Sequence, residues 1–518
     1  MFLFKKNLTE GEIKKEISIS IIISYITIGV GVLVNFFYTP FLLKNIGTNQ
    51  YGIHTFATSI ISWLSIITTA LCSGYLKFAS EEAKKDGSSV SRLNGIYFWF
   101  FLIVDAFVLL IGCTIAILIK IGAIPLNNFS ANEIALLVPC ILLMTINMAL
   151  SIFVSFFSLF EAYKERFIWA RLITLLQTLF NPVFSIIFIL LGGNVVVVCI
   201  VQAALTLINF VLLSFHAVGI SGMKIKLKIR DNTSKLLISN VITFSIFALI
   251  STIATSINQS ADKILLGFVS GPTDVAVYQL GMSLVLYLSL FCSSFTNSLS
   301  TRLYKVDLES KEQANKMSLK ISHLQTLVVC FIVGGFIICG KPFMNLWAGK
   351  ENVNAYYIGV ILFVINIFAF SNMASEVLVK SRGYFKFEAI YYVIEAICNV
   401  LLSLLFVFLF GKENALFACA GATFIIIFLF RWVGLTIFYK KKINLPMGGY
   451  YLKLIKFALI TFGCIAITFG ISKLFTINSD LIQLLVKGVI FSLLYPALTL
   501  VIDKESLTIV KQFIRKNK

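Results

Sequence analysis

Long apolar runs separated by short polar connections dominate the chain. A helix that crosses a bilayer needs about 20 apolar residues, and fourteen runs reach this length. Their approximate limits are 17–43, 52–76, 94–119, 133–160, 169–191, 194–217, 237–269, 275–301, 318–340, 355–379, 389–410, 414–438, 451–472 and 481–502. The pattern predicts an all-α polytopic membrane protein with about 14 transmembrane helices.

The seventh run contains a polar stretch, residues 251–263. Within it, Asn258, Gln259 and Asp262 share one helical face by the i, i+3, i+4 rule, and Lys263 follows directly. Hydrocarbon does not tolerate such a face unless it meets protein or water. Two interpretations stay open: the charges of Asp262 and Lys263 lie at the outer membrane interface, or they line a polar cavity.

Composition and charge agree with a membrane protein and indicate its orientation. The chain is 58% hydrophobic and 13% charged, with a net charge of +19, whereas soluble domains are about a quarter charged. Of the 43 lysines and arginines, 34 lie in alternate connections and at both termini. By the positive-inside rule both termini are then cytoplasmic. Because these cations are scattered over eight segments, no nucleic-acid partner is expected.

A spacing of 224 residues suggests an internal repeat. Small and polar positions of the first two runs fall on similar positions of the seventh and eighth, for example Gly47 on Gly271. Two six-helix lobes would then be parallel repeats about an axis along the membrane normal. The predicted parts are an N-terminal lobe (1–236), a C-terminal lobe (237–440) and an additional helix pair with a cytoplasmic tail (441–518).

Polar residues near the repeat positions are candidates for a site. Asn35 and Thr39 interrupt the first run, and His54 begins the polar face of the second. His54 either titrates or serves as an ordinary hydrogen-bonding side chain. Lys77 and Arg302 end the second and eighth runs at near-equivalent positions. They either bind an anionic group or anchor the helices at the cytoplasmic face.

Signatures of metal, cofactor and enzyme sites are absent from the sequence. All ten cysteines lie in apolar runs without a CxxC pair, which is typical of small hydrophobic side chains. The chain also lacks HExxH, GxSxG, Walker A and DxD motifs. We therefore expect a transporter with no cofactor, no metal and no catalytic residue.

Two segments carry a resemblance to a known family. FYTPFLLKNIGTNQYGIHTFATSI (37–60), with Pro40 predicted to kink its helix, and ADKILLGFVSGPTDVAVYQL (261–280) resemble the polysaccharide flippases. These belong to the multidrug/oligosaccharidyl-lipid/polysaccharide exporter superfamily. Relatives often carry an arginine in the first helix, whereas residues 17–43 here are neutral. The extra helix pair favours a lipid-linked substrate over a drug.

The resemblance implies a Wzx-type flippase in the bacterial inner membrane. It would move an undecaprenyl-diphosphate-linked oligosaccharide, an O-antigen repeat unit, by alternating access. Asn35, Thr39, Asn258 and Gln259 would contact sugar. Lys77 and Arg302 would attract the diphosphate, and Asp262, with Lys263 and His54 near it in the predicted path, would couple transport to an ion.

Partners and alternatives follow from the same resemblance. A polymerase and a chain-length regulator are expected beside the lipid-linked oligosaccharide and the bilayer. A cation-coupled drug exporter, and a flippase for capsule, exopolysaccharide or teichoic-type precursors, remain alternatives. A glycan polymerase fits poorly, because the outer connections are short and lack arginine.

Overall fold

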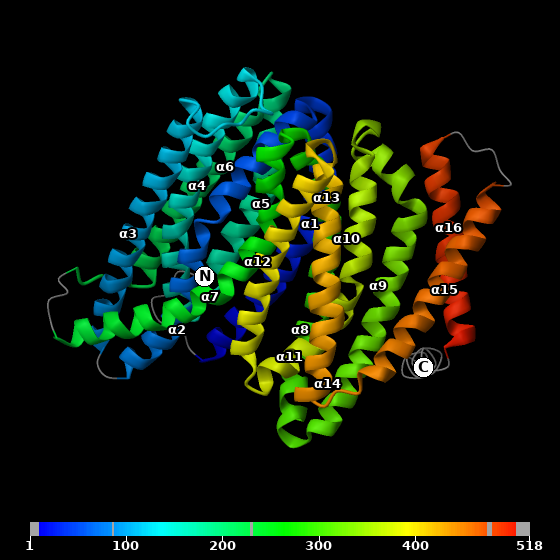
Figure 1. Ribbon diagram of the computed structural model, residues 1–518. Coiled ribbons are helices and arrows are strands. Elements are labelled where there is room, and N and C mark those ends of the chain that lie inside the picture. Colours follow the sequence, from blue (N-terminus) through cyan, green and yellow to red (C-terminus); the bar gives the residue numbers. More distant parts are fainter. Residues whose placement is uncertain (1–9, 85–86, 228–231, 474–478, 504–518) are drawn as a thin grey trace. The chain divides into compact units, whose positions relative to one another are not determined.

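The computed structural model describes residues 10–84, 87–227, 232–473 and 479–503, and these form helices and connecting turns (Figure 1). The first half contains α1 (Glu10–Ser62), α2 (Ser65–Ala83), α3 (Gly87–Lys120), α4 (Ala131–Tyr163), α5 (Ile168–Leu190), α6 (Val195–Phe215) and the π-helix η2 (His216–Ile220). The second contains α7 (Asn232–Val269), α8 (Pro272–Glu309), α9 (Lys311–Trp347), η3 (Lys350–Asn352), α10 (Asn354–Ser371), α11 (Met373–Ser381), α12 (Phe385–Phe410), η4 (Lys412–Asn414), α13 (Ala415–Ile427), the π-helix η5 (Phe428–Leu435), α14 (Thr436–Lys442), α15 (Met447–Lys473) and α16 (Asp480–Ile502).

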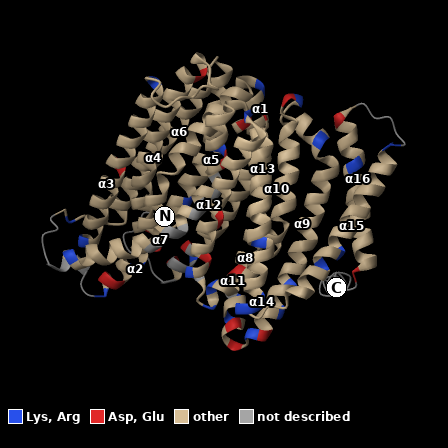
Figure 2. Ribbon diagram, in the orientation of Figure 1, with Lys and Arg blue, Asp and Glu red and all other residues tan. Residues whose placement is uncertain are grey.

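The predicted helical membrane fold is confirmed. Twelve helices of the described chain are long and apolar enough to cross a membrane. α1 includes the first predicted run and part of the second. The described side chains of α7 include the shorter apolar stretch Ser234–Ile246. Figure 2 shows that most charged residues lie near helix ends and turns.

The structure places a break in the predicted connection between the first two runs and divides the second run. α1 continues through Pro40, whose predicted kink stays a prediction, and its non-helical residue is Gly47, with φ +81° and ψ 164°. A glycine adopts this backbone without the steric cost that a Cβ would impose. The second predicted run, 52–76, is divided by the turn at Trp63–Leu64 between α1 and α2.

The described chain forms two compact units, which we treat separately. Unit 1 comprises residues 1–276 and 392–400, and unit 2 comprises 277–391 and 401–518. The predicted division at 236 and 440 concerns the sequence repeat and stays a prediction.

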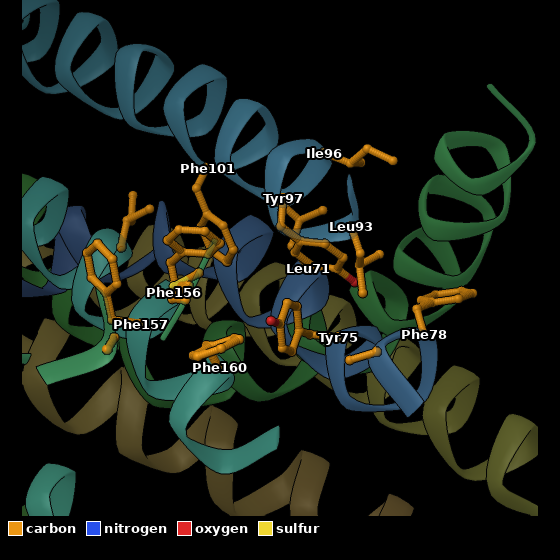
Figure 3. Close-up of a cluster of buried hydrophobic side chains, with 14 of the residues drawn as sticks. Leu71, Tyr75, Phe78, Leu93, Ile96, Tyr97, Phe101, Phe156, Phe157 and Phe160 are labelled. Carbon is orange, nitrogen blue, oxygen red and sulfur yellow. The ribbon is translucent and has the colours of Figure 1, made fainter. Parts of the chain in front are cut away.

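The core of unit 1 is an aromatic cluster between α2, α3, α4 and α7 (Figure 3). Tyr75 and Tyr97 meet edge to face, with ring centroids 4.9 Å apart. Phe101 and Phe156 pack at 5.5 Å. Aromatic pairs in these arrangements add to the free energy gained by burying their area, so this cluster holds the four helices together.

In unit 2, α15 and α16 pack against α9. Phe331 on α9 stacks on Phe491 at 5.7 Å, and the hydroxyl of Tyr495 donates to the carbonyl of Leu327 at 2.9 Å. Gly334 leaves space for the Phe491 ring, because a Cβ there would approach it within 2.7 Å. The last two helices are therefore fastened to the ninth.

Candidate functional site

The polar stretch of α7 lies inside unit 1, where α7 packs along α1 and α2. Ser62 Oγ on α1 is 3.1 Å from Ser260 Oγ on α7. Asp262 is only 7% exposed, and Lys263 is half-buried. Asp262 precedes the end of α7 by seven residues, about 10 Å of helix. The protein itself therefore covers Asp262. That Asp262 lines a cavity stays a prediction.

The turns that follow the first and seventh runs meet each other in unit 1. Gly47 and Gly271, 224 residues apart, both have a left-handed backbone, with φ of +81° and +100°. The hydroxyl of Thr273 donates to Oδ1 of Asn49. A Cβ on Gly52 would overlap the carbonyl oxygen of Pro272. The two turns thus touch through backbone as well as side chains.

Phe56 fills the space beneath these turns. Its ring is fully buried, lies edge to face on Phe268 at 5.7 Å, and packs on Phe129 at 5.5 Å. Gly267 makes room for the ring, because a Cβ there would overlap it. The amide of Asn128 in the α3–α4 connection donates to the carbonyl of Phe268 at 3.3 Å. This end of unit 1 is a closed contact among α1, the α3–α4 connection and α7; we call it the α1–α7 closure.

His54 contacts α6. Its Nε2 lies 3.3 Å from Oε1 of Gln202 on α6. Nearby, the backbone N–H of Val195 donates to Oε1 of Gln50 at 2.9 Å. His54 therefore ties α1 to α6.

The side chains of Asn35 and Thr39 donate hydrogen bonds to carbonyl groups of their own helix. Asn35 is exposed, and its amide donates to the carbonyl of Gly31 at 2.8 Å. The Thr39 hydroxyl donates to the carbonyl of Asn35 at 2.9 Å. Asn258 and Gln259 belong to α7, but their side chains lie outside the described part of the structure.

The two predicted anion-binding cations belong to different units. Lys77 is exposed at the end of α2, with Nζ 5.2 Å from the ring centre of Phe244 on α7 and 5.5 Å from that of Phe78. Arg302 is exposed on α8 in unit 2. That the two cations face one cavity stays a prediction.

Sequence reasoning missed a buried ionic cluster in unit 1. Glu161, at the end of α4, accepts a hydrogen bond from the His216 ring at 3.0 Å and from the Ser221 hydroxyl at 2.9 Å. Nη1 of Arg166 lies 3.4 Å from the same hydroxyl, and Trp169 stacks on His216 at 5.4 Å. Buried charges of this kind are retained when they are paired. The cluster joins α4, the α4–α5 turn and the π-helix η2.

Glu16 brings the start of α1 to the same region. It is 2% exposed, and Oε1 accepts the backbone N–H of Ile168 at 3.1 Å. Burial raises the pKa of Glu16 above its ordinary 4.5, while this hydrogen bond and the nearby Arg166 oppose the shift.

A second missed cluster centres on Arg382 in unit 2. Its guanidinium donates to Asp307 at 2.7 Å, to the side chain of Asn315 at 2.8 Å and to the carbonyl of Ile443 at 2.6 Å. Ser381 also donates to Asp307, at 2.6 Å. The partners lie 61 to 75 residues away in sequence, so no local pattern reveals them.

The described residues contain no group of three or more histidine, cysteine or acidic residues placed to hold a metal ion. The ten cysteines are free. The chemistry of the described site is hydrogen bonding and charge.

Comparisons with known proteins give the family and the fold. The model of the family described as "Polysaccharide biosynthesis protein" matches residues 14–299, more than half of the chain. No curated protein matches the sequence significantly.

Two solved structures of transporters share the fold. A structure of the lipid II flippase MurJ in an inward closed conformation superposes with a TM-score of 0.68 at 14% identity, covering 93% of this chain and 98% of that one. An inward-facing multidrug-resistance MATE transporter of the MOP superfamily superposes with a TM-score of 0.61 at 14% identity, covering 80% and 96%. With the family match, these place the chain in the polysaccharide biosynthesis protein family, with the fold of the MOP superfamily transporters.

Proposed function

We propose that the protein is a flippase that moves an undecaprenyl-diphosphate-linked oligosaccharide, an O-antigen repeat unit, across the bacterial inner membrane. The family, the helical membrane fold and the similarity to MurJ support a transporter of lipid-linked sugars. A polymerase and a chain-length regulator would act on the product. Capsule or exopolysaccharide precursors are the same class of substrate and would use the same mechanism.

The α1–α7 closure is the observation that carries this proposal. Alternating access requires a contact that seals one end of the path and then separates. Here the contact is built from small residues, two left-handed glycines and the packed rings of Phe56, Phe129 and Phe268. With the predicted topology this contact lies at the outer end of unit 1.

Locking the closure tests whether it must open. The Ser62 and Ser260 oxygens are 3.1 Å apart, so Ser62→Cys with Ser260→Cys, in a background without the native cysteines, should form a disulfide under oxidation. We expect oxidation to abolish surface glycan in cells that depend on this protein, and reductant to restore it.

A matched serine pair provides the control for the locking experiment. Ser318 and Ser375, on α9 and α11, have hydroxyl oxygens 3.3 Å apart. A disulfide there lies within the predicted second lobe and should leave transport intact. Transport that continues with the Ser62–Ser260 positions fully cross-linked contradicts alternating access through this closure.

The proposed site residues have separate roles. Asn35, Thr39, Asn258 and Gln259 would contact sugar, and Lys77 and Arg302 the diphosphate. Asp262 is the proposed ion-coupling residue, with Lys263 beside it and His54 as a further candidate. The proposal rests on the place of Asp262, a buried carboxylate on the polar face of α7.

Replacing the carboxylate tests the coupling role. Asp262→Asn should remove the dependence of translocation on a proton or sodium gradient, measured with a fluorescent lipid-linked oligosaccharide in proteoliposomes. An unchanged gradient dependence assigns coupling to another residue.

Export of cationic dyes by the wild type, without glycan translocation, would favour the drug-exporter alternative that the MATE-like fold suggests.

A further inference from the structure

A second site is suggested by a cavity at the other end of unit 1, the predicted cytoplasmic end. Its volume is about 460 Å³, within the range of small-molecule sites. The ends of α2, α3 and α4 and the segment after η2 form its walls. The lining residues are Ala83, Val90, Ser91, Asn94, Phe160, Tyr163, Lys164, Gly222 and Lys224.

The charge of this cavity is positive. Lys164 and Lys224 both line it, both are exposed, and no aspartate or glutamate is among the lining residues. Nζ of Lys164 lies 5.4 Å from the ring centre of Tyr163 and 5.8 Å from that of Phe160, so aromatic rings hold the ammonium near the cavity. Ser91 adds a hydroxyl. Ammonium and hydroxyl donors together suit a phosphate.

The wall that carries Lys224 is fixed by hydrogen bonds. Residues 222–227 lie along the start of α3, where the Asn94 amide donates to the carbonyl of Lys224 at 2.9 Å. The backbone N–H of Lys226 donates to the carbonyl of Ser91 at 2.9 Å. A Cβ on Gly95 would overlap the carbonyl oxygen of Lys226. The segment therefore approaches α3 as closely as glycine permits, and the backbone that carries Lys224 is held in place.

The cavity adjoins the aromatic core, of which Figure 3 shows several side chains. Phe160 is a member of both. The Tyr75 hydroxyl donates to Asn94 Oδ1 at 2.6 Å, so Asn94 is held from the core side while its amide holds Lys224. A ligand thus meets apolar rings below and positive charge at the rim.

We propose that this cavity binds the phosphate group of an anionic glycerophospholipid from the adjacent membrane leaflet. The chemistry of a phosphodiester with an attached apolar chain matches the cavity's lysines and rings. Trp99, one helical turn beyond Gly95 on α3, is 43% exposed, and its indole donates to the carbonyl of Leu227 at 3.2 Å. Tryptophan is enriched where a helix crosses the membrane interface. The cavity therefore lies where headgroups are available, and the proposal is independent of what the protein transports.

Lipid titration of the purified full-length protein tests the site. Native mass spectrometry would count phosphatidylglycerol and phosphatidylcholine bound to the wild type and to Lys164→Gln/Lys224→Gln. We expect the wild type to bind phosphatidylglycerol in preference to phosphatidylcholine. The double variant should bind phosphatidylglycerol about thirtyfold more weakly, because each lysine near an anionic lipid surface raises the affinity about fivefold.

Lys226→Gln is the matched control. Lys226 lies on the same exposed segment with the same charge, but it does not line the cavity, so this variant should bind lipid like the wild type. An equal loss in the control, or undiminished phosphatidylglycerol binding by a double variant that unfolds at the wild-type temperature, overturns the proposal. Displacement of the lipid by an equal concentration of inorganic phosphate would also overturn it, in favour of a free phosphate site.

Discussion

At the scale of single residues, unit 1 contains two buried glutamates whose hydrogen bonds bear on its stability. Glu161 is fully buried yet accepts two side-chain hydrogen bonds. Glu16 is almost as buried and accepts one from the backbone. A buried charge costs free energy unless such partners replace the hydrogen bonds that water would make. Glu161 has more of these replacing hydrogen bonds than Glu16.

Replacing Glu16 should change how stability depends on pH. Folding raises the pKa of Glu16 above 4.5, so the folded state binds more protons than the unfolded state between 4.5 and the folded value. Its contribution to stability is therefore fully present below 4.5 and is lost as the pH rises through the folded pKa. Glu16→Gln should flatten the unfolding temperature across this window, measured in detergent. An identical pH profile for both proteins contradicts the raised pKa.

The residue scale is also where sequence reasoning was weakest. The sequence singled out Asp262, and the structure buries it in protein. The clusters around Glu161 and Arg382 escaped notice because their partners come from different helices. Asn35 and Thr39 bond to carbonyl groups of their own helix, and their predicted contact with substrate stays a prediction. Spacing along a helix predicts a shared face, whereas contacts between helices depend on packing.

At the scale of elements, close approach at glycine determines how the helices of unit 1 join. Gly52 lets α1 touch the turn before α8, and Gly267 lets α7 receive the ring of Phe56. The positions of the helices themselves followed from hydrophobic length, because a run of about 20 apolar residues has few alternatives in a bilayer. The break at Gly47 falls in the predicted connection between the runs 17–43 and 52–76, because residues 44–51 are mostly polar.

A methyl group at Gly52 should weaken the α1–α7 closure. The added Cβ of Gly52→Ala meets a backbone carbonyl that a side-chain rotation cannot relieve. We expect a loss of about 1–3 kcal/mol in stability, together with faster labelling of a cysteine placed at Ser260. Thermal unfolding and maleimide labelling measure the two effects.

Gly29→Ala is the control for this change. Gly29 also lies in α1, and a Cβ there meets nothing within 4 Å. Because alanine is the better helix former, this variant should be as stable as the wild type or slightly more so. Equal behaviour of the two variants would mean that the Gly52 contact does not hold the closure.

At the scale of the whole molecule, the distribution of lysine and arginine predicts the orientation in the membrane. The span Lys412–Lys442 offers a direct test, because Glu413 and Lys441 are exposed at its two ends. In intact cells an impermeant maleimide should label Glu413→Cys, and it should label Lys441→Cys only after permeabilisation. The opposite pattern would reverse the topology and place the α1–α7 closure on the cytoplasmic side.

The contact between Asn49 and Thr273 has a consequence for the origin of the chain. The two residues are 224 positions apart, the spacing of the predicted repeat, yet they bond to each other. In a symmetric dimer, a residue near the two-fold axis meets its own copy. If the two halves descend from a duplicated gene, this position lay beside the axis of the ancestral dimer. In that dimer the residue at this position contacted the identical residue of the other subunit. After duplication the two positions could differ and become a hydrogen-bond acceptor and a donor.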